Sequence, residues 1–291
     1  MTRTKRFGRL LPLLAAALAG AALYRGDAPA GVVLVGAGDI ASCARHRGEA
    51  TARLLDTIPG TVFTAGDNAY PWGTFDQYLR CYHVTWGRHK ARTRPTPGNH
   101  DYATPGAAGY FRYFGALAGD SGAGYYSYEL GAWHIIALNS NITMRRDSAQ
   151  ERWLRADLAA HPRRCTLAYW HHPRFSSGST HGSDVRSRVV WRDLYAAGAD
   201  VVVNGHEHNY ERFAPMTPAG VVDTARGIRE FVVGTGGESH YPLGPPLASS
   251  EARNDATFGV LRLTLYPGSY AWRFIPVAGA TFSDSGRGDC H

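Results

Sequence analysis

The chain has 291 residues, of which 44% are hydrophobic and 19% are charged. This composition supports a sizeable core and excludes an intrinsically disordered protein. The formal net charge is +7, but residues 1–30 hold five of the 31 basic residues and one of the 24 acidic ones, so the rest of the chain carries only +3. A balance this even argues against a nucleic-acid partner.

The first thirty residues have the pattern of a secretory signal peptide. A basic segment that ends at Arg9 precedes an apolar run at residues 10–23, and Ala28-Pro29-Ala30 offers a cleavage site. The run is too short to span a bilayer, which takes about 20 apolar residues. We therefore predict a signal peptide at residues 1–30, one folded domain at 31–291, no stable membrane span and a secreted, periplasmic or cell-surface location. A short uncleaved anchor is the alternative.

If the protein is exported, its four cysteines are expected to form disulfide bonds. Cys43, Cys81, Cys165 and Cys290 show no C-x-x-C spacing, which argues against a structural zinc site. An oxidising compartment favours two disulfide bonds, for which three pairings exist, over four buried thiols.

Strands and helices alternate along the first two thirds of the domain. Short runs rich in Val, Ile and aromatic residues indicate buried strands, and amphipathic stretches indicate helices. The predicted strands lie at residues 32–35, 61–64, 134–138, 165–170 and 200–203. The predicted helices lie at residues 49–58, after a capping box at Ser148 and Glu151, and at residues 185–197.

The C-terminal part is richer in strands. Residues 228–233, 259–266 and 269–276 have strand patterns, with a hairpin turn at Pro267-Gly268 and a long loop at 234–250. Alternating strands and helices followed by a strand-rich end predict one layered α/β domain.

Metal-ligand residue types follow the ends of these strands, each after glycine or close to proline. In layered α/β proteins the crevice lies beyond the carboxyl ends of the strands, so these side chains are expected to converge. A glycine beside each one allows close approach of the backbone. The candidate ligands are Asp39, Asp67, Tyr70, Asn99, His171, His206 and His208.

This set fits two metal ions. Asp, Asn and His favour first-row transition metals over calcium, and one bridging carboxylate with three further ligands per ion requires seven residues. Two ions about 3.5–4 Å apart can clamp the attacking and leaving oxygens of an in-line displacement.

In their order, the motifs resemble the calcineurin-like metallophosphoesterases, and among them the purple acid phosphatases. Asp39 is followed by Ile40-Ala41, where most of the superfamily has a histidine ligand, and Tyr70 of Gly-Asp-x-x-Tyr supplies the missing ligand. Residues 205–212, Gly-His-Glu-His-Asn-Tyr-Glu-Arg, resemble the same subgroup. The resemblance implies a four-layer αββα sandwich with two mixed sheets and a site at the strand carboxyl ends.

The resemblance also implies a role for each residue. A ferric ion is held by Asp39, Asp67, Tyr70 and His208, and a divalent Fe, Zn or Mn ion by Asp67, Asn99, His171 and His206. His100 and His181 are the catalytic residues that contact the phosphate or the leaving group. The implied function is a secreted acid phosphatase-type enzyme, in which metal-bound hydroxide attacks a phosphate monoester in line.

Several alternatives stay open from the sequence. The same metals suit a phosphodiesterase, and a non-catalytic metal- or phosphate-binding module is the third hypothesis. His172 competes with His171 as ligand, His181 is alternatively a plain loop residue, and His240 either touches substrate or packs within its loop. We interpret Glu211 and Arg212 as a structural pair behind the site.

Two further expectations follow from the motif positions. Asp39 comes almost directly after the signal, without the β-sandwich domain of the plant-type members, which suggests a compact single-domain form. Cys43 follows the Asp39 loop and Cys81 lies eleven residues beyond Tyr70, so we predict that they pair. Cys165 then pairs with Cys290 by exclusion.

Overall fold

Two mixed β-sheets face each other in the structure, a computed structural model that describes residues 1, 2, 4, 31–119 and 122–291. The predicted signal peptide falls almost wholly outside these residues. Residues 31–291 form one compact unit.

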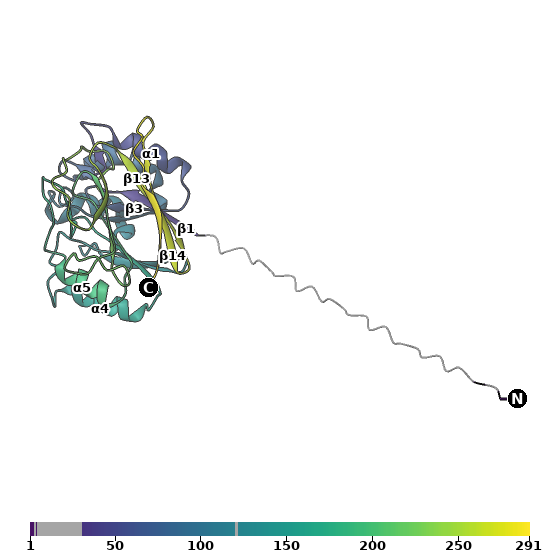
Figure 1. The fold of residues 1–291 in the computed structure, drawn as a ribbon. Helices are drawn as coiled ribbons and strands as arrows, with labels where there is room; N and C mark the ends of the chain where they lie inside the picture. The colour runs from purple at the N-terminus through teal and green to yellow at the C-terminus, as the bar shows by residue number, and fades with distance from the viewer. Residues whose placement is uncertain (3, 5–30, 120–121) are drawn as a thin grey trace. The chain divides into compact units, whose positions relative to one another are not determined.

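The first sheet has six strands, and its parallel strands end at one edge. Its order is β15 (Ser285–Asp289), β14 (Ser269–Pro276), β13 (Gly259–Tyr266), β1 (Val32–Ala37), β3 (Thr61–Ala65) and β5 (Thr93–Thr96). The strands β1, β3 and β5 run parallel, and β13 pairs antiparallel with β1. Figure 1 shows β13 and β14, in yellow, beside β1 and β3 from the start of the domain.

The second sheet has seven strands. Its order is β12 (Ser250–Asn254), β10 (Tyr210–Phe213), β11 (Arg229–Val233), β9 (Val201–Asn204), β8 (Cys165–Tyr169), β7 (Trp133–Ala137) and β6 (Tyr126–Leu130). The strands β7, β8, β9 and β11 run parallel. A separate parallel pair, β2 (Ala41–Ser42) with β4 (Ala69–Tyr70), ties together the loops that follow β1 and β3.

Three helices are predicted from the sequence and lie close to the predicted positions in the structure, whereas the other helical segments are not predicted. The α-helices are α1 (Gly48–Thr57), α2 (Phe75–Gln77), α3 (Ala108–Phe114), α4 (Ala149–Ala160) and α5 (Arg188–Ala196). Short 3₁₀ and π segments are η1 (Tyr78–Tyr82), η2 (Trp86–Arg92), η3 (Pro105–Ala107) and η4 (Gly115–Ala118). The three predicted helices are α1, α4 and α5.

Two of the helix starts differ from the prediction. The Ser148 hydroxyl accepts from Glu151 N at 3.2 Å, but the carboxylate of Glu151 accepts from Asp147 N and not from Ser148, so only half of the capping box forms. The helix predicted from residue 185 begins at Arg188, because Asp184 accepts from Arg186 N at 2.8 Å in a local turn.

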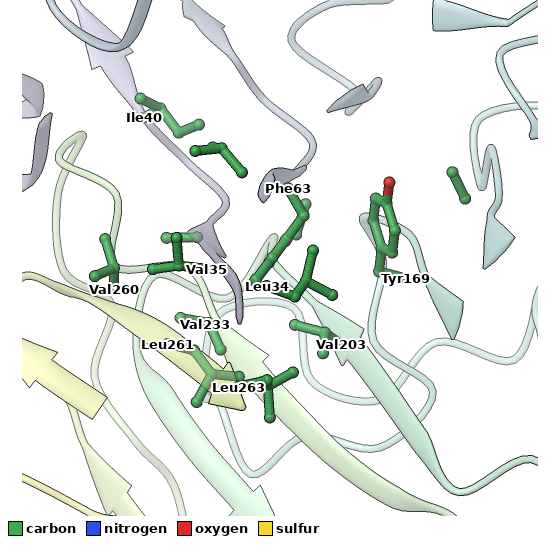
Figure 2. Close-up of a cluster of buried hydrophobic side chains, with 14 of the residues drawn as sticks. Leu34, Val35, Ile40, Phe63, Tyr169, Val203, Val233, Val260, Leu261 and Leu263 are labelled. Carbon is green, nitrogen blue, oxygen red and sulfur yellow. The ribbon is translucent and has the colours of Figure 1, made fainter. Parts of the chain in front are cut away.

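The core between the sheets is built from alternate strand residues. Leu34, Phe63 and Leu263 of the six-stranded sheet pack with Val203 and Val233 of the other, as Figure 2 shows. All five are at most 1% exposed, so each contributes about 1.5–3 kcal/mol of burial free energy.

The opposite face of the seven-stranded sheet is covered by helices. Ala168 and Val202, whose side chains alternate with the inner ones, pack in a second cluster with Leu154 of α4 and Trp191 of α5. Figure 1 places α4 and α5 together, and α1 contacts β13 of the first sheet. The predicted four-layer αββα fold with two mixed sheets is confirmed.

Both predicted disulfides are present. Cys43 pairs with Cys81 and Cys165 with Cys290, with Cα separations of 5.1 and 5.4 Å. Disulfides of this kind are typical of proteins in oxidising compartments. Among the helices of the described residues, none has the length and apolar character needed to cross a membrane.

Candidate metal centre

The carboxyl ends of five parallel strands deliver all seven predicted ligands to one place. Asp39 follows β1, Asp67 follows β3, Tyr70 lies in β4, Asn99 follows β5, His171 follows β8, and His206 and His208 follow β9. A chain of direct contacts joins the seven side chains, in two groups that share Asp67.

The first group surrounds the phenol of Tyr70. Its Oη lies 2.9 Å from Asp39 Oδ1, 2.9 Å from Asp67 Oδ2 and 3.2 Å from His208 Nε2. His208 Nε2 also lies 3.2 Å from Asp39 Oδ1. A single phenol proton cannot satisfy two carboxylates and an imidazole lone pair, so the donor set has a surplus of acceptors. Such a set fits a cation.

The second group surrounds His171. Its Nε2 lies 3.3 Å from Asp67 Oδ2, 3.0 Å from Asn99 Oδ1 and 3.2 Å from His206 Nδ1. One ring nitrogen again faces three partners with lone pairs. Because Asp67 offers oxygens to both groups, the arrangement fits two cations that share one carboxylate.

Three of these residues have a backbone conformation that side chains rarely adopt. Asp39, Asp67 and His206 have φ values of 61°, 51° and 70°, in the left-handed region. The turns let backbone N–H groups reach the carboxylates: His206 N donates to Asp39 Oδ2 at 2.8 Å and His100 N to Asp67 Oδ1 at 2.7 Å. Strain of this kind persists where the surroundings enforce it, commonly at functional sites.

Two glycines show why this residue type precedes the ligands. Gly66 has a φ of 82°, and a Cβ there would collide with the ring of His171. A Cβ at Gly98 would collide with the carboxylate of Asp67. The predicted close approach of backbone to ligand is therefore confirmed at both positions.

The ionisable ligands strongly perturb one another's pKa. Burial raises the pKa of Tyr70 well above its ordinary value, and the charges of Asp39 and Asp67 raise it further. Burial alone would lower the pKa of His171, but the Asp67 carboxylate outweighs it and raises the pKa to about 9. Burial and the neighbouring His171 lower the pKa of His206 to about 2.

Hydrogen bonds from outside the cluster fix the ligand rings. His171 Nδ1 lies 2.8 Å from Ala65 O, and His208 Nδ1 lies 2.7 Å from Ser239 Oγ. Such contacts orient metal-binding imidazoles and set their tautomer. Ser239 belongs to the long loop at residues 234–250, which therefore contacts the site.

Asp101 is a buried support that the sequence pattern did not assign. Its carboxylate accepts from Gly98 N at 2.8 Å, Asn68 Nδ2 at 2.9 Å and Tyr78 Oη at 2.6 Å. Burial and the nearby Asp67 charge raise the pKa of this carboxyl to about 6. Its place two residues after the candidate ligand Asn99, in the run Gly98-Asn99-His100-Asp101, was the only available signal.

The two predicted catalytic histidines pack against different residues of the ligand cluster. The ring of His100 is 4.4 Å from that of Tyr70, and its Nε2 is 4.0 Å from Asp67 Oδ2. The ring of His181 is 4.1 Å from that of His206. Their side chains are 34% and 40% exposed, whereas five of the seven candidate ligands are buried and Asn99 and His206 are half-buried, so both can reach a bound molecule from solvent.

Two of the open alternatives concern neighbouring histidines. The Nδ1 of His172 lies 2.7 Å from Ser140 Oγ, while His171 is the histidine that contacts Asp67. His240 stacks on Phe258 with ring centroids 3.9 Å apart, which is packing within the loop region.

The structure shows one aromatic residue beside the ligands that was not named from the sequence, and it changes the interpretation of Glu211 and Arg212. Tyr241, missed from the sequence, stacks on His208 at 3.9 Å with an interplanar angle of 7°. Glu211 and Arg212 both make structural contacts, but not with each other: Glu211 accepts from Ser177 N at 2.7 Å and Arg212 pairs with Asp284 at 2.7 Å.

Comparison with known proteins identifies the family. The family model for calcineurin-like phosphoesterases matches residues 33–210. Purple acid phosphatase 21 of Arabidopsis thaliana is 30% identical over 188 residues, which cover 57% of this chain and 42% of that protein. Purple acid phosphatase 18 of the same plant is 30% identical over 166 residues, which cover 53% of this chain and 37% of that protein. The chain therefore matches less than half the length of these two relatives.

Solved structures share the fold. A purple acid phosphatase from yellow lupin, Lupinus luteus, superposes with a TM-score of 0.71 at 18% identity, over 88% of this chain and 53% of that one. A dimetal phosphatase from Danio rerio superposes with a TM-score of 0.64 at 12% identity, over 90% of this chain and all of that one. The chain belongs to the calcineurin-like phosphoesterase family, and within it is similar to the purple acid phosphatases.

Proposed function

We propose that this chain, as a member of the calcineurin-like phosphoesterase family, hydrolyses phosphate monoesters at a two-metal centre. The observation that carries the proposal is the surplus of buried acceptors around Tyr70 and His171, with Asp67 common to both groups. The family implies a dinuclear centre and a phosphate ester substrate. The name phosphatase, which the similar plant proteins carry, favours monoesters.

The two groups of contacts divide the ligands between the ions. One ion is held by Asp39, Asp67, Tyr70 and His208, and the other by Asp67, Asn99, His171 and His206. When bound, the ions supply an activated water and neutralise charge on the phosphoryl oxygens. The protein contributes a rigid frame, because most of the ligands are buried and hydrogen-bonded from behind.

His100 and His181 are the groups that contact the substrate. The N–H groups of these two imidazoles hold the phosphate oxygens, and one of them donates the proton that the leaving group needs. His100 Nδ1 donates to Pro71 O at 2.7 Å, which leaves Nε2 directed at the cluster. Because Nδ1 holds the proton of the neutral ring, the protonated form of His100 is the one whose Nε2–H meets the phosphate or the leaving group.

We further propose that the ion beside Tyr70 is ferric and the other divalent. A phenol oxygen between two carboxylates gives a hard, anionic ligand set, which suits Fe(III) better than a soft metal. The second set, with Asn99 and two histidines, suits Fe, Zn or Mn in the divalent state.

The experiment combines metal analysis, visible absorption and turnover of the purified protein. We expect two metal ions per chain, one of them iron, a broad visible band, and faster hydrolysis of p-nitrophenyl phosphate than of bis(p-nitrophenyl) phosphate. Faster hydrolysis of the diester would replace the monoesterase proposal with a phosphodiesterase. Two bound metals without hydrolysis of either ester would indicate a binding module.

We also propose that residues 1–30 are a signal peptide and that residues 31–291 are the secreted metallophosphoesterase catalytic domain. The two disulfides support an oxidising compartment. N-terminal sequencing of the exported protein tests this, with a mature start expected between residues 20 and 31. An intact Met1 on protein recovered from the cytoplasm would contradict it.

A further inference from the structure

The segment at residues 174–182, which carries His181, is held by three buried glutamates. Glu230 accepts from Arg174 N at 2.9 Å and from Phe175 N. Glu211 accepts from Ser177 N at 2.7 Å, and Glu207 accepts from the backbone N–H groups of His181 and Gly182. All three glutamates are 0% exposed. Buried side-chain oxygens that accept from backbone N–H groups satisfy those donors and fix the path of the segment.

Glu207 has a special position among the three. It lies between the candidate ligands His206 and His208, yet its carboxylate contacts the His181 segment. The Oε1 atom is 2.6 Å from His181 N and 3.8 Å from His181 Nδ1. Gly178 makes room for this carboxylate, because a Cβ at that position would collide with it.

The contacts of Glu207 fix where the His181 ring lies. With its backbone held by Glu207, the ring packs 4.1 Å from the ring of His206 and 5.4 Å from that of Tyr241. His181 is otherwise on an exposed loop, where a free side chain would sample several rotamers. A displacement of about 1 Å at a reacting group can cost about 100-fold in rate.

We propose that Glu207 is a positioning residue, which holds His181 over the metal centre and acts on the reaction only through it. This rests on the proposed function, in which His181 contacts the phosphate or donates to the leaving group. The residue between the two histidines of Gly-His-x-His would thereby link the ligands of the centre to the loop that meets the substrate.

The test compares Glu207→Ala, Glu207→Gln, His181→Ala and the double variant Glu207→Ala/His181→Ala. Turnover is measured on p-nitrophenyl phosphate, which has a good leaving group, and on an alkyl phosphate, which has a poor one. We expect Glu207→Ala and His181→Ala to slow the alkyl ester by about 10–100-fold more than the aryl ester, because the poor leaving group needs the proton. Glu207→Gln keeps an accepting oxygen and should stay within a few-fold of the parent.

The double variant decides whether Glu207 acts through His181. If it does, the double variant is no slower than His181→Ala, since coupled residues are not additive. Calorimetry measures the affinity for inorganic phosphate without depending on turnover. The double variant should bind phosphate no more weakly than His181→Ala does. Glu230→Gln is the matched control: it alters the same segment at Arg174 and should lower stability without any preference between the two esters.

Three results would overturn the proposal. They are losses that multiply in the double variant, loss of bound metal in Glu207→Ala, and a ratio of alkyl-ester to aryl-ester slowing in Glu207→Ala that differs from the ratio in His181→Ala. If Glu207→Ala fails to fold, Glu207→Asp replaces it, because it keeps the charge but cannot reach His181 N. A parent protein that hydrolyses neither ester would instead refute the proposed function, while the phosphate affinities still decide on the coupling of Glu207 to His181.

Discussion

Two clusters of histidine and aspartate in this chain have similar composition but different hydrogen bonding. In each, the ligand-type atoms of three side chains lie within 4.8 Å of one another. The first cluster contains Asp39, Asp67 and His171 of the candidate metal centre; the second, which we call the α4 cluster, contains His134, Asp157 and His161.

In the α4 cluster, both carboxylate oxygens of Asp157 have a partner that can donate a proton. Asp157 Oδ2 lies 2.8 Å from His134 Nε2, and its Oδ1 accepts from the Ser127 hydroxyl at 2.6 Å. His161 Nδ1 lies 2.9 Å from the backbone oxygen of Asp157, at the end of α4. His134 comes from strand β7 and Asp157 from helix α4, and His161 caps the end of α4.

The metal centre differs in both respects. Its acceptors outnumber its protons around Tyr70 and His171, and Asp39, Asp67 and His206 have positive φ values. The comparison teaches that proximity of histidine and aspartate does not by itself mark a cation site. A surplus of acceptors on a strained backbone is the more informative sign.

The largest effect that tests this contrast is expected for Asp67→Ala. The variant should lose both ions and reduce turnover to background, because Asp67 is the one side chain in contact with both groups of ligands. Metal content by mass spectrometry and turnover of p-nitrophenyl phosphate are the measurements. A variant that retained one full equivalent of metal would show that the two groups are independent.

The next effect concerns His100, which faces the cluster without belonging to it. His100→Ala should keep both metals and lower kcat by about 10²–10³-fold, the usual scale for the loss of one proton donor or oxyanion contact. Metal content separates this from a ligand role. An emptied site would mean that His100 is a ligand and that its assignment as a catalytic residue is wrong.

Tyr70→Phe should have a smaller effect on rate but a specific spectroscopic one. Three ligands of the first ion remain, so we expect a loss of turnover of about 10-fold, the lower end for the loss of one contact that supports a metal. If the phenol oxygen binds ferric iron, the visible band disappears in this variant. A fully active parent protein that is colourless and contains only zinc or manganese would refute the iron assignment and leave the other six ligands in place.

Strands that contain an apolar run could be predicted from the sequence, and strands without such a run could not. The apolar runs of β1, β3, β8 and β9 indicated their positions to within one or two residues. The edge strand β15 has the sequence Ser-Gly-Arg-Gly-Asp and alternates only between exposed and half-buried residues. It forms because β14 offers it unpaired backbone groups, a condition that no local pattern reveals.

The same distinction applies to the site. The seven candidate ligands could be found because each follows a strand and a glycine or precedes a proline, a pattern visible in the sequence. Glu207 and Asp101 could not be assigned, because their carboxylates accept from backbone N–H groups contributed by other segments, at His181 and at Asn68. Any residue has such an N–H group, so the sequence of the partner segment carries no signal.

The α4 cluster provides the smallest effect and the control for all the others. Burial raises the pKa of the Asp157 carboxyl, but hydrogen bonds from His134 and Ser127 outweigh it and leave the pKa below its ordinary value. A lowered pKa in the folded state means that the carboxylate stabilises the fold above the pKa of the unfolded chain, about 3.9. This contribution is lost as the pH falls through the lower, folded-state pKa.

Asp157→Asn should therefore lower the free energy of unfolding by about 1–2 kcal/mol at neutral pH, the scale of a hydrogen bond to a charged group. The difference between parent and variant should be constant above about pH 5 and shrink below about pH 4, as the parent carboxylate becomes protonated. Urea denaturation at several pH values measures it, while metal content and kcat should match the parent. If the variant lost metal or activity, the α4 cluster would be coupled to the metal centre, and satisfied hydrogen bonds would no longer distinguish a structural cluster from a functional one.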